Sequence, residues 1–214
     1  MFPGVPHHVT QRGNHRESVF FAPGDPEAYL ELLRNHARRA GLAVFAYCLM
    51  PNHTHTVAVP SSKDSLERAL QPVHSQYAQR VNRMRGIVGH LWQGRFHSCA
   101  LDADHFLNAV RYVERNPVAA GLVARAEDYR WSSAAAHCGL RADPLLEPAS
   151  GSSVLKGIAN WSDWLAIRVP EECQKLLQRN SRLGLPCGSE KFVEELEKLA
   201  GCELRYRSWG GRRK

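Results

Sequence analysis

The sequence lacks the features of a membrane or secreted protein. No stretch approaches eighteen consecutive apolar residues, so no membrane-spanning helix and no membrane partner are expected. The first residues, MFPGVPHHVTQRGN, lack the charged and then apolar pattern of a secretory signal. The six cysteines are scattered without a C-x-x-C pair, which argues against a zinc site and against a dense disulfide framework. A reducing cytoplasm is therefore the expected compartment.

Acidic residues are in the minority, and no internal repeat is present. The chain has 28 Lys and Arg against 21 Asp and Glu, for a net charge of +7. An excess of this sign favours a polyanionic partner such as nucleic acid, because Lys and Arg neutralise phosphates. The 214 residues, 43% of them hydrophobic, suffice for one domain of ordinary size with a real core.

Strand-like and helix-like segments alternate along the first two thirds of the chain. The second and third apolar strands are joined by a short Pro-Asn turn, which predicts an antiparallel hairpin. The pattern predicts an α+β domain with a central antiparallel sheet and helices on one face. The expected strands are 5–10, 42–50 and 53–59, and the expected helices are 26–41, 64–85, 104–116 and 127–137.

The composition changes after residue 140. The stretch RADPLLEPASGSS is rich in Pro, Gly and Ser and is typical of a linker. Short helical segments over 162–180 and 189–200 follow, and then a basic tail. We therefore expect a domain over 1–140, a linker over 141–161 and a small helical extension over 162–214.

Two histidines stand one residue apart in YCLMPNHTHTVAV, at the head of the third expected strand. Residues i and i+2 of a strand share one face, so His53 and His55 would present two imidazoles side by side. This geometry suits a metal ion. For an isolated H-x-H pair, two half-exposed histidines without a special role are the commoner explanation.

The helix around AVRYVERNP carries a second pair of polar residues. Tyr112 and Asn116 are four residues apart and would share one helical face. A metal held by two imidazoles and an amide oxygen would leave sites open for phosphate oxygens, with Tyr112 one turn away as attacking group. Simple packing of Tyr112 and a turn at Asn116 is the alternative. Tyr77 is a competing nucleophile, although its spacing favours a packing role.

Several longer motifs in the same order resemble the REP-associated tyrosine transposases, a branch of the single-tyrosine HUH transposases. PGVPHHVTQRGNHR resembles the opening strand of that family, and YCLMPNHTH its HUH segment. HLWQGRF, RYVERNPVAAGLV, WSSAAAH and GSEKFVEELEKLAG are similar to later blocks. The resemblance therefore extends over nearly the whole chain.

The resemblance implies a ferredoxin- or RRM-like fold and the activity of a DNA transposase. His53 and His55 fall on the metal ligands of the motif, Asn116 on the third ligand and Tyr112 on the nucleophile. The implied cofactor is Mg²⁺ or Mn²⁺. The implied reaction cleaves single-stranded hairpin DNA through a 5′-phosphotyrosine and rejoins it. Monomer and homodimer are both open.

Aromatic and basic residues elsewhere are candidate DNA contacts. Trp92 could stack on an unpaired base or pack in the core, and Arg95 is the favoured phosphate contact. The strand histidines His7 and His8 could approach DNA or metal, although ordinary strand positions are the simpler interpretation. The remaining candidates for DNA binding are Gln93 and Arg111 and, in the basic tail, Arg205, Arg207, Arg212 and Arg213.

Two further function classes compete with the enzyme. A domesticated protein could bind palindromic repeats without cutting them, but the intact set of His53, His55, Tyr112 and Asn116 favours cleavage. A phosphohydrolase of the histidine-triad type needs a histidine at position 57, where this chain has valine.

Overall fold

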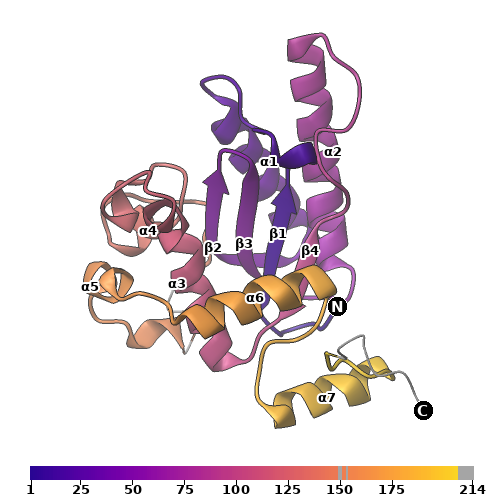
Figure 1. Ribbon diagram of the computed structural model, residues 1–214, viewed down its shortest axis with the longest axis vertical. Coiled ribbons are helices and arrows are strands. Elements are labelled where there is room, and N and C mark those ends of the chain that lie inside the picture. The colour runs from indigo at the N-terminus through magenta and orange to yellow at the C-terminus, as the bar shows by residue number, and fades with distance from the viewer. Residues whose placement is uncertain (149–150, 153, 207–214) are drawn as a thin grey trace, which may run out of the picture.

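The protein is built on a four-stranded antiparallel sheet (Figure 1). The computed structural model describes residues 1–148, 151–152 and 154–206. The sheet order is β2-β3-β1-β4, and the elements follow the chain as β1-α1-β2-β3-α2-β4. This is the ferredoxin-like arrangement, so the predicted α+β class with a central antiparallel sheet is confirmed. The strands are β1 His7–Arg12, β2 Leu42–Met50, β3 His53–Pro60 and β4 His97–Ala100.

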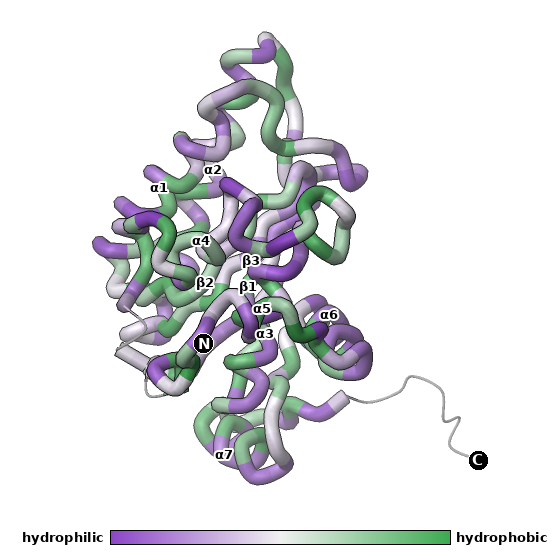
Figure 2. The backbone as a smooth tube through the Cα atoms, turned by 90° about the vertical axis from the view of Figure 1, so that its left-hand side faces the viewer, coloured by the Kyte–Doolittle hydropathy of each residue, from purple (hydrophilic) through white to green (hydrophobic). Residues whose placement is uncertain are grey.

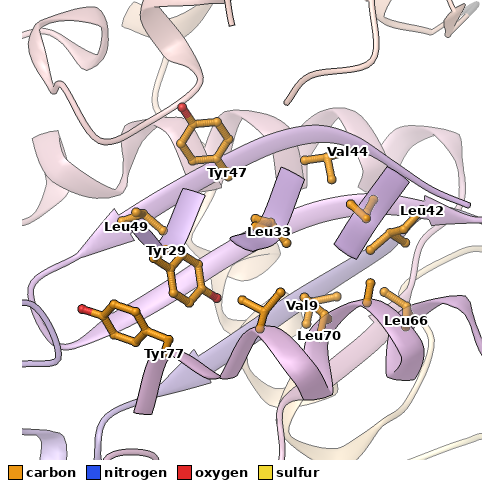
Figure 3. Close-up of a cluster of buried hydrophobic side chains, with 14 of the residues drawn as sticks. Val9, Tyr29, Leu33, Leu42, Val44, Tyr47, Leu49, Leu66, Leu70 and Tyr77 are labelled. Carbon is orange, nitrogen blue, oxygen red and sulfur yellow. The ribbon is translucent and has the colours of Figure 1, made fainter. Parts of the chain in front are cut away.

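Helices α1 (Asp25–Ala40) and α2 (Ser65–Arg85) cover one face of the sheet. Tyr29, Leu33 and Ala37 recur every four residues of α1 and are buried, while polar residues lie between them, as the alternating colours of α1 in Figure 2 show. The helix ends where Gly41 takes a left-handed conformation. Figure 3 shows side chains of both helices and of the sheet filling this first core.

A second core lies on the opposite face, under α3 (Ala103–Ala119) and α6 (Glu171–Leu183). Phe106, Val110 and Val113 of α3 pack against β2, and Leu177 of α6 joins the same cluster. Figure 1 shows α6 lying across the sheet in front of β1 and β4. The expectation that helices cover one face only is therefore wrong, because the apolar residues of β2 point to both sides and each side needs a cover.

Several expected limits differ from the structure. The strand expected over 5–10 runs instead from His7 to Arg12, and the short β4 had no strong apolar pattern. Helix α3 continues through Pro117, because a proline in the last turn removes only one hydrogen bond. The helix expected over 127–137 is reduced to a 3₁₀ turn, Ala126–Asp128, and the single turn α4, Ala134–His137.

Residues after 140 contact the sheet domain at several points. The amide of Glu147 donates to the carbonyl of Val44 at 2.7 Å, and Leu155 lies in the second core. Residue Cys187 donates its amide to Ala100 at 2.8 Å. The division of the chain at residues 140 and 161 stays a prediction. The remaining helices are α5 Trp161–Ala166 and α7 Glu190–Ala200.

Across the described part of the chain, no helix has the length and apolar character needed to cross a membrane.

Candidate active site

Two neighbouring central strands direct polar side chains to the face that α3 and α6 cover. In the antiparallel register, Thr10 of β1 lies opposite His55 of β3, and Arg12 lies opposite His53. Side chains alternate along a strand, so His8 shares this face with Thr10 and Arg12. The two histidines of the H-x-H motif lie together as expected, with ring centroids 4.8 Å apart.

The proton of His53 is fixed by its neighbour Asn52. The amide nitrogen of Asn52 donates to the carbonyl of Arg16 at 3.0 Å, and a carbonyl can only accept. The other amide atom, Oδ1, therefore faces His53 Nδ1 at 2.6 Å and accepts its proton. His53 Nε2 is left with a lone pair, which is the form that binds a metal.

The proton of His55 is directed by a chain of buried groups. His55 Nδ1 lies 2.9 Å from His8 Nε2, and His8 Nδ1 lies 2.7 Å from the hydroxyl of Ser181 on α6. When His55 Nδ1 donates to His8, the Nε2 atom of His55 is free to bind a metal. The two imidazoles are stacked, with centroids 5.1 Å apart. His8 is thus the partner that orients a candidate ligand.

Burial keeps both motif histidines neutral at physiological pH. Loss of solvent, together with the smaller effect of the positive charge of Arg12, lowers the pKa of His53 to about 4. The pKa of His55 lies well below its usual value for the same reason, with His53 adding to the effect. A neutral imidazole needs no proton loss before it binds a cation.

Helix α3 brings Asn116 and Tyr112 to these histidines. The Asn116 amide lies 3.5 Å from His55 Nε2, and the ring of Tyr112 lies 5.5 Å from that of His55. Oxygen and nitrogen of an amide are assigned from their partners, so a half-turn of Asn116 presents its oxygen at the same point. The amide of Gln178 on α6 donates to the Tyr112 hydroxyl at 3.1 Å. All four residues predicted to carry the chemistry therefore lie together.

The site fits a hard divalent cation only if an amide oxygen takes part. Among the described residues, no three His, Cys, Asp or Glu side chains are arranged to hold a metal ion. Two neutral Nε2 atoms and the amide of Asn116 make a set of three with room for further oxygen ligands. Amide and water oxygens are ligands that suit Mg²⁺ and Mn²⁺, whereas the two imidazoles are typical ligands of transition metals.

Tyr112 borders two open cavities. The larger has a volume of about 650 Å³ and lies between α6 and β1, with five cationic side chains and, among the described residues, no carboxylate in its wall. The cations are Arg12, Arg16, Lys175, Arg179 and Arg182. The smaller cavity, about 350 Å³, is lined by Arg115, Asn116 and Arg168. A phosphate chain could therefore pass Tyr112 on either side.

Comparison with known proteins agrees with this architecture. The family model described as "Transposase IS200 like" matches residues 3–116. The chain belongs to the IS200-like transposase family. The transposase resemblance read from the sequence is thereby confirmed, and the matched region contains His53, His55, Tyr112 and Asn116.

Solved structures include two similar proteins. One is a REP-associated tyrosine transposase bound to a REP hairpin, with 20% identity and a TM-score of 0.54 over 66% of this chain and 84% of that one. The other is a putative transposase from Deinococcus radiodurans, with 16% identity and a TM-score of 0.40 over 54% and 92%. The first shows that this transposase-family chain shares its fold. A comparison with curated protein sequences finds no match.

The expected DNA contacts of the transposase occupy different environments. Trp92 is buried in the first core and donates its indole proton to the carbonyl of His74 at 2.9 Å, so base stacking would require the ring to leave the core. Gln93 lines the larger cavity and Arg95 is exposed on the loop before β4. The Arg111 guanidinium stacks on the ring of Trp164 at 4.3 Å and lines neither cavity beside Tyr112.

The expected basic tail lies mostly outside the described residues. Arg205 pairs with Glu194 at 3.2 Å and with Glu197 at 3.6 Å. Arg207, Arg212 and Arg213 lie outside the described residues.

Tyr77, the competing nucleophile, has a packing role. Its side chain is fully buried beneath α1, and its hydroxyl donates to the carbonyl of Val19 at 2.7 Å.

Sequence reasoning missed the contribution of α6. Lys175, Gln178, Arg179 and Arg182 are spaced by three and four residues and line the larger cavity together. This spacing predicts one helical face, but a charged helical face is usually a solvated one. Only the packing of α6 against β1 and β4 reveals that it borders Tyr112. The sequence indicates only that His8 could approach DNA or metal. Its position beside His55 depends on a hydrogen bond to Ser181, 173 residues away.

Proposed function

We propose that this chain nicks and rejoins single-stranded DNA that carries a hairpin, through a covalent bond between Tyr112 and a 5′ phosphate. The observation that carries the proposal is the grouping of Tyr112 with two neutral imidazoles and an amide beside a cationic cavity. Membership of a transposase family supports the class of reaction. The hairpin substrate is suggested by the structural neighbour, whose DNA is a REP hairpin.

In the proposed cleavage, the Tyr112 oxygen attacks the phosphorus of one phosphodiester. The bond from phosphorus to the 3′ oxygen breaks, the 3′ oxygen takes up a proton and the hydroxyl proton of Tyr112 leaves to water in the cavity. The product is a phosphotyrosine at the 5′ end and a free 3′ hydroxyl. The same hydroxyl, or that of another strand, reverses the step. The reaction needs no nucleotide cofactor, because one phosphodiester replaces another.

The residues around Tyr112 have separate tasks. Gln178 donates to the Tyr112 oxygen and holds it toward the cavity. The cations Arg12 and Arg16 attract and orient the phosphate chain. A divalent ion held by His53, His55 and Asn116 would withdraw charge from the scissile phosphate. An unpaired strand suits the site because a stiff duplex resists an in-line approach to a single phosphate.

The test uses one oligonucleotide with a foldback hairpin and a single-stranded flank, incubated with Mn²⁺. We expect wild-type protein to form an adduct that survives denaturing electrophoresis, and Tyr112→Phe to bind the DNA equally well without an adduct. Tyr77→Phe is the matched control and should retain the adduct. Wild-type binding without any adduct would favour a protein that reads repeats without cutting. Equal cleavage of blunt duplex would contradict the choice of substrate.

A further inference from the structure

Helix α6 has an exposed cationic face directed into the larger cavity. Lys175, Gln178, Arg179 and Arg182 lie at positions i, i+3, i+4 and i+7, which is one stripe along a helix. All four line the cavity next to Tyr112. The opposite side of the helix is buried against the sheet through Leu177 and Ser181. The packing of α6 against the sheet therefore directs these four side chains into the cavity.

The docking of α6 is specific. Ser181 bonds to His8 at 2.7 Å, and Asn180, which is buried, donates to the carbonyl of Pro186 at 2.6 Å. Gln178 reaches the hydroxyl of Tyr112. These three contacts lie within about one turn of α6. They reach the sheet, α3 and the loop after α6, and they hold the stripe beside the candidate nucleophile.

The cations of the stripe have weak competing partners. Lys175 pairs with Glu171 at 2.6 Å, but both side chains are more than two thirds exposed, and such a pair contributes little. Arg179 lies over the ring of Tyr206 at 4.7 Å, which leaves its outer donors accessible. Across the cavity, Arg12 and Arg16 add two more positive charges. Like charges on two walls, without a carboxylate among the described lining residues, indicate an anionic occupant.

The dimensions suit a polynucleotide better than a single small anion. From Lys175 to Arg182 the helix rises by about 10 Å at roughly 1.5 Å per residue. This length exceeds the size of one phosphate group, so the stripe can contact more than one phosphate of an extended strand. Three cations in line, opposite two more, thus match successive phosphates of one chain.

We propose that the stripe formed by Lys175, Arg179 and Arg182 is the wall that binds the single-stranded DNA leading to Tyr112. This inference rests on the proposed function, since it names the surface that receives the same substrate. It also assigns a role to a helix that lies beyond the matched family region of 3–116. In this proposal the residues of the matched region carry out the chemistry, and α6 binds the DNA strand.

The magnitude follows from counterion release. Each neutralised phosphate of a single strand contributes a slope of about 0.7 to the dependence of log affinity on log salt. Removal of three cations should reduce that slope by about 2. A difference in slope of about 2 changes the affinity ratio by roughly 100-fold over a tenfold change in salt. If the variant and the wild type bind equally at about 1 M salt, the variant therefore binds roughly 100-fold more weakly at about 0.1 M.

The experiment compares two triple variants of the full chain by fluorescence anisotropy with unstructured oligothymidylate over a range of salt. The test variant is Lys175→Gln, Arg179→Gln and Arg182→Gln, in which glutamine preserves helix propensity. The control removes three exposed arginines of α1, on the other face of the sheet, as Arg34→Gln, Arg38→Gln and Arg39→Gln. Circular dichroism and melting temperature report whether both variants fold.

We expect the test variant to lose about two units of slope and roughly 100-fold in affinity, while the control stays within a few-fold of wild type. Equal losses in the two variants would attribute binding to net charge and overturn the proposal, as would unchanged binding by the test variant. If wild-type protein binds the strand but forms no adduct, the proposed chemistry fails, and the salt slopes still decide the role of α6. If the test variant is unfolded, single substitutions at Lys175 and Arg182, both exposed on the helix, replace it. Each should lower the slope by about 0.7.

Discussion

The chain from Ser181 through His8 to His55 leads to a prediction about metal affinity in the absence of DNA. His8→Phe keeps an aromatic ring stacked on His55 but removes the acceptor for the His55 Nδ1 proton. His55 is then free to adopt the other tautomer or to turn its ring, and either change removes the Nε2 lone pair from the site. The substitution is thus expected to weaken binding of Mn²⁺ without removing a ligand.

The size of the effect can be estimated. Loss of a partner that orients a metal-binding histidine typically costs between about 10- and 100-fold in metal affinity. This range corresponds to about 1.4–2.7 kcal/mol. A loss within this range is expected, because both side chains are largely buried and a water from the neighbouring cavity would restore only part of the lost interaction.

Isothermal titration of the DNA-free protein with Mn²⁺ measures this affinity directly. The control is His7→Phe, an equally buried histidine of the same strand that faces the other side of the sheet and bonds to the carbonyl of Val5. His8→Gln supplies an amide oxygen and should recover part of the affinity. Equal Mn²⁺ affinity in wild type and His8→Phe, or equal losses at His7 and His8, would refute the assignment of His8 as a positioning residue.

Two further predictions concern stability. Burial lowers the pKa of His74 from 6.5 to about 3, so between these values the unfolded chain binds more protons and stability falls as the pH decreases. His74→Gln keeps an acceptor for Tyr29 and should remove about 2 kcal/mol of the loss between pH 7 and pH 5 in urea titrations; an unchanged pH profile would contradict this. Glu114 of α3 is the buried acceptor of His137 and Ser133 and thereby connects α3 to α4. Glu114→Ala removes this acceptor and should lower the free energy of unfolding by on the order of 3 kcal/mol. A loss below about 1 kcal/mol would show that this buried pair does not hold α3 in place.

The parts of the site that depend on residues close together in the chain could be predicted from local sequence patterns. The two-residue spacing of His53 and His55 and the four-residue spacing of Tyr112 and Asn116 each specify a shared face, and the structure brings the two faces together. The hairpin of β2 and β3 was predicted from the Pro51-Asn52 turn and is present, with β3 ending one residue later than expected. Asn52 also fixes the proton of His53, which no pattern in the sequence indicates.

Contacts between distant segments could not be predicted in the same way. The second covered face of the sheet requires α6 to fold back onto β4, and the amphipathic pattern of α6 does not say which surface receives it. The role of Trp92 could not be predicted for the same reason. In the sequence, an aromatic residue near Gln93 and Arg95 is equally compatible with stacking on DNA and with packing in the core. Its hydrogen bond to His74, 18 residues earlier, gives it a place in the core.

The central claim is that Tyr112 forms a bond with the 5′ phosphate of a cleaved strand. The most direct test traps the adduct on a hairpin oligonucleotide labelled at its 3′ end and maps the modified tryptic peptide by mass spectrometry. The account predicts a nucleotide on the peptide Tyr112–Arg115, retention of the 3′ label on the protein, and release of a fragment with a free 3′ hydroxyl that a polymerase can extend. A nucleotide on any other residue, or retention of a 5′ label instead, would contradict it.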